Sequence, residues 1–449
     1  MKRNAFYLGV FIISMGSFTH IARAELDIRL PVADLPFNTQ ADLTTPSMQQ
    51  SLALHLGFYQ GIHTAIEGRW GESHPWWSLA AIYAIDIYTI GSPLGQTWLH
   101  EEWHRAGIGE FGMSSHNDTY NFPGPGDPVA VSRIDENELI ALKRDHNANM
   151  IRKSSAGLEG QLYVNSIMEK GSFFSHVETH DEVLLWGNVL LNVYYMNQCA
   201  GTGANDVTQE LYEAENGDLS KRDLVGMDCN AWVYDMHRPD EELSDRGIYP
   251  GGGGIDWYVS WDDMTTEEQS FMKKQARLSY LNLIDPFLLR FKRFQFTPTG
   301  SDEPIYWNAN MRHYMASFGT SIDFNFFLEK GNINIYSSLH WYQNQNSHFP
   351  GIEAELYRYP MALFNRKLFA SARLALWQQP EEQLFRTSNG QLGALAGVSL
   401  AFRAFKRMEF FVDMEAKTTG WVAGNVYLGN NVSTRLGLSY IVPSFSQNH

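Results

Sequence analysis

The sequence predicts an α+β protein in which a helical region is followed by an antiparallel β-barrel of about eight strands. Between residues 52 and 285, apolar side chains recur with the spacing of helices. Beyond Tyr306, apolar and polar side chains alternate, which is the period of strands. We therefore divide the chain into a leader (1–24), a helical domain (25–285) and a barrel domain (286–449).

Residues 1–24 have the features of a secretory signal peptide. Lys2 and Arg3 give a positive start, an apolar run too short to span a bilayer comfortably follows, and Ala22-Arg23-Ala24 fits a cleavage site. We expect an exported protein whose mature chain begins at Glu25. A retained N-terminal anchor is the alternative, and the short apolar run argues against it.

The net charge limits the kinds of partner that the protein can bind, and the cysteine content bears on the cell compartment. The formal net charge of −16 over 449 residues argues against nucleic acid as a partner. Cys199 and Cys229 are the only cysteines, and they lack the close spacing of a metal or redox motif. In an exported protein they form either one disulfide or two free thiols.

Helical patterns predict helices over 52–68, 76–90, 92–107, 135–170, 182–196 and 265–285. Ser92 is a good N-cap for the third of these, and Gly107 suits its end. The apolar stretch 76–99 has nearly the length of a membrane span, but Asp86 and a Gly-Ser-Pro breaker favour a buried helix and a turn. Residues 199–263 are polar, acidic and Gly-rich, so we expect surface loops there.

The helix predicted over 92–107 contains the sequence H-E-x-x-H. His100 and His104 are one turn apart on the same face, so both imidazoles can reach one metal ion. Glu101 lies beside them and can act as a general base. This pattern resembles zinc-dependent peptidases, in which two histidines bind zinc and the glutamate takes a proton from water. The alternative is an amphipathic helix whose His pair is incidental.

A catalytic zinc ion needs a third protein ligand, and Glu159 is our choice. Gly157 and Gly160 flank it on the following helix, and small residues let another helix approach closely. With Glu159, the two helices resemble the gluzincin metallopeptidases, in which a glutamate from a second helix completes a Zn2+ site. Tyr163, one turn after Glu159, is then a candidate oxyanion donor. The alternative for Glu159 is an exposed helix carboxylate.

Other side chains could supply the third ligand instead. His146 lies on the same predicted helix as Glu159, about 20 Å away along a straight axis, so the two cannot bind one ion together. His176 and His180 form a second pair with helical spacing, for which a cap or loop is the simpler interpretation. Two loop residues could also approach the metal: His116 and Asp118.

The last third of the chain carries about seven alternating segments between residues 314 and 440, and residues 287–297 could supply an eighth. Their polar positions include Asp323, Glu353 and Arg373, which predicts a polar interior and an apolar exterior. This pattern resembles small eight-stranded outer-membrane barrels, although the chain lacks their terminal aromatic residue. The resemblance implies contact with outer-membrane lipid. A soluble antiparallel barrel or sandwich is the alternative.

Together, these patterns predict a zinc-dependent peptidase anchored in the outer membrane of a Gram-negative envelope. Its catalytic domain would lie in the periplasm and act on protein or peptide. A soluble periplasmic location is an alternative. So is a non-enzymatic outer-membrane protein whose helical domain is a binding or assembly module, with a structural metal or none. An intramembrane metalloprotease with residues 76–99 in the bilayer fits least, because other clean apolar spans are scarce.

Overall fold

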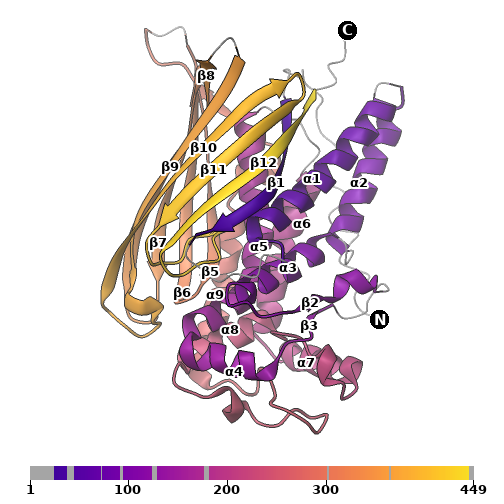
Figure 1. Ribbon diagram of the computed structural model, residues 1–449, viewed down its shortest axis with the longest axis vertical. Coiled ribbons are helices and arrows are strands. Elements are labelled where there is room, and N and C mark those ends of the chain that lie inside the picture. The colour runs from indigo at the N-terminus through magenta and orange to yellow at the C-terminus, as the bar shows by residue number, and fades with distance from the viewer. Residues whose placement is uncertain are drawn as a thin grey trace.

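The computed structural model in Figure 1 combines a large curved antiparallel sheet with a group of helices, so the α+β class is confirmed. It describes residues 25–37, 45–71, 73–91, 95–123, 129–175, 182–300, 303–363 and 366–443. The expected signal peptide (1–24) and the pair His176 and His180 lie outside these ranges.

The described ranges contain nine α-helices: α1 (Met48–Ile66), α2 (Pro75–Gly91), α3 (Gln96–Gly109), α4 (Glu136–Asp145), α5 (Asn147–Phe174), α6 (Glu182–Cys199), α7 (Gly203–Glu215), α8 (Asp228–His237) and α9 (Thr266–Leu278). The six predicted segments are helical, but the segment predicted over 135–170 is two helices. Asp135 caps α4 by accepting hydrogen bonds from two backbone N–H groups. The chain breaks at His146, and α5 then continues to Phe174.

The motif helix α3 differs from its prediction at both ends. Gly95 is its N-cap, without a side-chain hydrogen bond, and Ser92 lies outside the described residues. Gly107 does not end the helix, which continues to Gly109. Instead, Gly107 lets α3 pack closely on α5, because a Cβ atom there would be 3.3 Å from the Cα atom of Lys153.

Ten strands of the described residues form the large sheet: β1 (Glu25–Pro36), β4 (Phe294–Phe296), β5 (Ile305–Ala316), β6 (Gly319–Lys330), β7 (Ile333–Gln343), β8 (His348–Leu363), β9 (Arg366–Pro380), β10 (Gly390–Phe405), β11 (Met408–Lys417) and β12 (Asn431–Pro443). Their order is β1-β12-β11-β10-β9-β8-β7-β6-β5-β4. A separate short pair joins β2 (His116–Asn117) to β3 (Val131–Ser132).

The predicted closed barrel of about eight strands is wrong, because the sheet is open, with β1 and β4 at its edges. The first strand was not predicted, since residues 25–36 show no clear period. The alternation from Tyr314 to Leu328 belongs to two strands that meet at a tight turn before Gly319. Residues 287–297 contribute only the short β4, since a 3-10 turn occupies Pro286–Leu289.

The predicted inversion of the sheet, polar inside and apolar outside, is confirmed. Ionisable side chains form a chain of ion pairs across the inner face, with successive partners 2.7 to 4.0 Å apart, in the order Asp323, His340, Glu353, Arg373, Glu415, Arg435, Asp413 and Arg29. The outer face exposes large apolar side chains, including Phe324, Phe326, Leu339, Leu374, Leu376, Val398, Leu400, Val412 and Leu436.

Helices and sheet are in direct contact. Helix α5 packs against the inner face, where Lys170 Nζ lies 2.6 Å from Glu355 and Ser166 Oγ lies 3.2 Å from the Tyr314 hydroxyl. These contacts supply hydrogen-bond and ion-pair partners for polar side chains that point inward from the sheet. Helices α4, α7, α8 and α9 gather at the lower end of the sheet in the view of Figure 1.

No helix in the described ranges has both the length and the hydropathy that crossing a membrane would require.

Candidate metal centre

Three side chains from two helices converge on one point. His100 and His104 come from α3, and Asp228 is the first residue of α8. The Nε2 atoms of the two histidines lie 3.0 Å apart, and the Asp228 carboxylate is 3.0 Å from His100 Nε2 and 3.4 Å from His104 Nε2. The ligand atoms of these three described side chains all lie within 4.8 Å of one another, so they could hold one ion.

The geometry and the tautomers of this group suit a metal cation. Nitrogen and oxygen ligands about 2.1 Å from a tetrahedral ion stand about 3.4 Å from one another, close to the separations observed. His104 Nδ1 donates to the carbonyl oxygen of Lys153 at 2.5 Å, which leaves the Nε2 lone pair directed at the group. Burial alone would raise the pKa of Asp228, but the two imidazoles hold that pKa well below its ordinary range. Two imidazole nitrogens and a carboxylate oxygen facing one point are ligand types that a divalent metal takes.

Helix α5 closes one side of the group at Gly157. A Cβ atom at this position would lie 2.5 Å from the Nε2 atoms of both His100 and His104. One turn later, Gly160 allows the same close approach to Trp103, where a Cβ atom would be 2.8 Å from the ring. The prediction that small residues bring a second helix against α3 is confirmed.

Replacing Gly157 by alanine is expected to lower metal affinity by at least about 10-fold, because the methyl group would displace the two histidine rings. Metal titration of the purified variant measures this. Gly171→Ala is the matched control, since it lies on the same helix with no atom within 4 Å of the added Cβ. Equal affinity in both variants would show that the rings move aside at no cost to binding.

Glu101 lies next to the group and keeps limited contact with solvent at 7 % exposure. Burial raises the pKa of its carboxyl group well above the ordinary range, and nearby carboxylates, first among them Asp223 and Asp228, raise it further. Burial also raises the pKa of Asp223, to about 7. A cation held by the triad would oppose this effect and favour ionised Glu101.

The neighbouring Glu102 has a structural role. It is fully buried and accepts hydrogen bonds from Arg105, Asn117 and Tyr120. These bonds fix the loop after α3, which carries two side chains considered as ligands from the sequence. Neither belongs to the metal group: the His116 ring lies 3.3 Å from Asn121 Oδ1, and Asp118 accepts from Ser132 Oγ at 2.8 Å.

The prediction of Glu159 as third ligand is corrected, because Asp228 completes the group. Both Glu159 oxygens are held by a bidentate Arg152, and they also accept from Trp421 Nε1 at 3.2 Å and from the backbone N–H of Gly424 at 2.8 Å. The side chain is buried rather than exposed. It ties α5 to the loop between β11 and β12.

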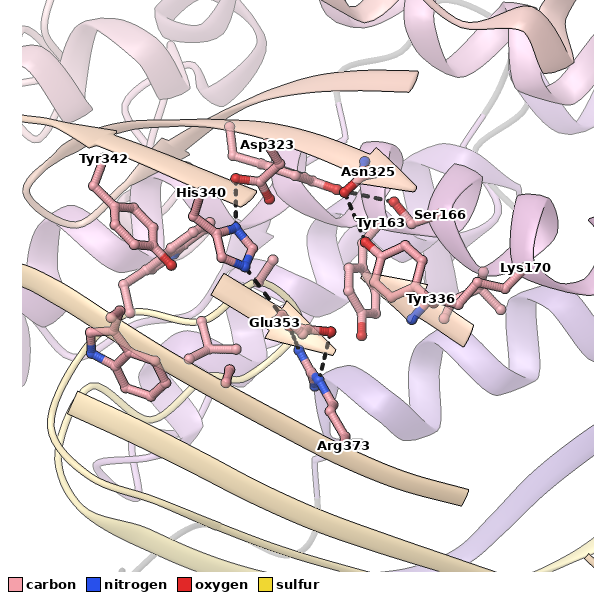
Figure 2. Close-up of a pocket in the computed structure, with 17 residues that line it drawn as sticks. Tyr163, Ser166, Lys170, Asp323, Asn325, Tyr336, His340, Tyr342, Glu353 and Arg373 are labelled. Carbon is pink, nitrogen blue, oxygen red and sulfur yellow. Dashed lines mark hydrogen bonds and ion pairs between the residues drawn. The ribbon is translucent and has the colours of Figure 1, made fainter. Parts of the chain in front are cut away.

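Tyr163, predicted as an oxyanion donor, lies elsewhere. Figure 2 shows it in a small cavity between α5 and the sheet, with Lys170 and Tyr336. The cavity measures about 40 Å³, which is room for about three water molecules. Tyr195 of α6 was not among the predicted site residues. Its ring centroid is 6.4 Å from that of His100, and its hydroxyl accepts a hydrogen bond from the Asp228 N–H at 3.3 Å. Tyr195 positions the start of α8 beside the two histidines.

The remaining candidate ligands from the sequence are His146, His176 and His180, and of these the structure describes His146. His146 stands at the junction of α4 and α5, with its ring 4.8 Å from that of Phe111. His176 and His180 lie outside the described residues.

Asp228 lies in the stretch expected to be surface loops, which contains α7 and α8 instead. The sequence analysis did not select it, and the one feature that could have drawn attention to it is the neighbouring Cys229, which pairs with Cys199 at the end of α6. Of the two alternatives for the cysteines, the structure has the disulfide. This bond fastens the start of α8 to α6 and so holds Asp228 near α3.

Replacing both cysteines by alanine is expected to lower the unfolding free energy by about 3–4 kcal/mol, from the entropy of the 30-residue loop that the bond closes. Metal affinity is expected to fall as well, because Asp228 loses its covalent tether. Urea unfolding and metal titration measure the two effects separately. Lower stability with unchanged metal affinity would mean that packing alone holds α8 in place.

No protein-family model, curated protein or solved structure matches the chain.

Proposed function

We propose that this protein is a zinc-dependent peptidase of the bacterial cell envelope, attached to the outer membrane through the apolar outer face of its sheet. The observation that carries the enzymatic part is the convergence of His100, His104 and Asp228, with Glu101 beside them. Three protein ligands that leave a coordination position for water are typical of catalytic zinc sites.

The chemistry proposed for the site uses these residues in distinct roles. A cation held by His100, His104 and Asp228 would supply a more acidic water molecule and a polarised peptide carbonyl. Glu101 would accept a proton from the water whose oxygen attacks the carbonyl carbon, and would give that proton to the amine nitrogen as the C–N bond breaks. The Lys153 carbonyl keeps His104 in the tautomer that binds, and Tyr195 keeps Asp228 in place. The substrate is protein or peptide.

Metal analysis and peptide hydrolysis test this proposal together. The purified mature protein is expected to contain one zinc ion per chain and to cleave an unstructured protein such as casein. His100→Ala should lose both the metal and the activity. A wild-type protein without stoichiometric metal would overturn the assignment of the site.

A structural metal in a non-enzymatic module is the second candidate, and the burial of the group favours it. The side chains of His100, His104 and Asp228 are 13 %, 2 % and 4 % exposed. Structural zinc sites are closed, whereas catalytic sites keep a position open to solvent. The two functions differ in what Glu101 does, since a structural site has no use for a base.

Two features support attachment to the outer membrane. The outer face of the sheet carries apolar side chains, while charged side chains pair on its inner face, which is the arrangement of strands in lipid. Exposed Lys330, Lys406 and Arg407 flank turns at one rim of the sheet, although the chain as a whole is acidic. Basic side chains at that level suit anionic lipid headgroups.

The connections between strands favour an orientation opposite to the periplasmic one expected from the sequence. At the end of the sheet that contacts α8 and Glu159, two connections are short (317–318 and 344–347) and two are long (381–389 and 418–430). At the other end, 331–332 and 406–407 are tight turns. Outer-membrane strands have short periplasmic turns and longer extracellular loops. We therefore place the metal centre on the extracellular side.

An intact-cell labelling experiment tests this orientation. A cysteine in place of the exposed Glu210 on α7 is expected to react with a membrane-impermeant maleimide on intact cells. A cysteine in place of Lys406 should react only after the outer membrane is permeabilised. The reverse pattern would put the metal centre in the periplasm.

A further inference from the structure

An open sheet in lipid has a physical difficulty at its two edges. Edge strands present unpaired N–H and C=O groups, and a bilayer offers no water to satisfy them. If the sheet lies in a membrane, as proposed above, something must cover β1 and β4. Helix α1 packs on β1, and Tyr83 of α2 contacts Arg290 just before β4. We call these two helices, with the turn formed by the π-helical segment Glu67–Gly71 and residues 73–74, the α1–α2 hairpin.

The α1–α2 hairpin bridges from one edge of the sheet toward the other. On the β1 side, Ser47 Oγ donates to Asp34 at 2.7 Å, and Gly57 brings α1 so close that a Cβ atom would be 3.1 Å from Ile28. On the β4 side, Arg290, just before that strand, donates to the Tyr83 hydroxyl of α2 at 3.4 Å. Helix α2 also packs on α6, whose Trp186 Nε1 donates to the Leu288 carbonyl at 2.8 Å. Figure 1 shows α1 running beside β1.

The charges of the hairpin are arranged as lipid contact requires. The only Asp, Glu, Lys or Arg within α1 and α2 is Asp86. It turns inward, where its carboxylate is 2.6 Å from His63 Nε2 and both side chains are almost fully buried. Polar groups of helices in lipid face protein in this way. By contrast, Glu67 and Arg69 are in the turn.

The outward side chains of the hairpin are apolar, and its tryptophans gather near the turn. Large side chains on this surface are Leu54, Phe58, Trp76, Trp77, Ile87 and Tyr88, which are 41 % to 74 % exposed. Trp70, His74 and Trp77 line a groove of about 510 Å³ beside Ala80 and Ala81. Tryptophan next to charged residues is typical of the headgroup level of a bilayer. In Figure 1, the turn of the hairpin lies toward the same end as the β12 terminus.

We propose that the α1–α2 hairpin seals the gap between β1 and β4 and that its outer face contacts phospholipid acyl chains. Sheet and hairpin together then form one continuous wall with a polar interior and a lipid-facing exterior. Lipid fits this surface better than a protein partner, since both helices lack outward charges and the charges begin only at the turn. The inference rests on the proposed membrane attachment of the sheet.

Depth-sensitive quenching tests the inference. Single cysteines replace Phe58 and Tyr88 on the hairpin, Leu376 on the outer face of the sheet, and Glu210 on α7, with the native disulfide left intact. Each full-length variant is labelled with bimane and reconstituted in phosphatidylethanolamine–phosphatidylglycerol vesicles that contain nitroxide-labelled lipid. Labels at Phe58, Tyr88 and Leu376 are expected to lose fluorescence to a similar degree, and the label at Glu210 to keep it.

The other outcomes separate the two proposals. Quenching at Leu376 with none at Phe58 and Tyr88 would overturn the lipid contact of the hairpin while the membrane attachment of the sheet stands. Quenching at none of the four positions would overturn both. Two hairpin positions are used so that a local disturbance at one of them does not decide the result.

Discussion

Replacing Glu101 by glutamine is expected to reduce peptide hydrolysis by about 100- to 10,000-fold, the range of general-base catalysis, while zinc remains stoichiometric. Glutamine has nearly the same shape as glutamate but cannot accept the proton. The side chain is next to the metal group without being one of its three ligands. Activity against casein and metal content are measured on the same preparation.

The result separates an enzyme from a structural metal site. Glu210→Gln is the control, because it makes the same chemical change at an exposed position on α7. If Glu101→Gln retained both metal and wild-type hydrolysis, the general-base assignment would be wrong and the activity would come from elsewhere. If neither wild type nor variant hydrolysed peptide while both bound zinc, the structural role would be favoured.

Exchanging the third ligand is the second change with a large expected effect. Asp228→Asn should weaken metal binding by more than about 100-fold, because loss of even an outer-shell partner costs about 10- to 100-fold. Glu159→Gln should leave metal content unchanged and lower the unfolding free energy by about 3 kcal/mol, because it leaves the buried Arg152 without its charged partner.

The two variants together test the correction made to the sequence prediction. Metal titration and urea unfolding are measured for each, with the exposed Glu210→Gln as reference. Zinc lost from Glu159→Gln but retained by Asp228→Asn would restore the gluzincin-like ligand set. Zinc retained by both would move the third ligand outside the triad described here.

The sequence by itself determined the features that depend on local spacing. The H-E-x-x-H spacing predicts that His100 and His104 share one face of a helix, because helical periodicity is a property of a few consecutive residues. Alternation along the last third of the chain likewise fixed which side chains of each strand point inward. The small residues around Glu159 indicated a close contact between helices, and α3 and α5 make it.

The tertiary structure decided everything that joins distant parts of the chain. Asp228 reaches the histidines because α8 is fastened to α6, and a separation of more than a hundred residues leaves no periodic signal for such a contact. The same holds for β1, which pairs with β12 across nearly the whole chain, and for the open edges of the sheet. The contact between α3 and α5 near Glu159 was predicted correctly. The Glu159 carboxylate, however, binds Arg152, Trp421 and Gly424 and does not belong to the metal group. Local periodicity tells which way a side chain points, whereas the partner that it meets depends on how the elements pack.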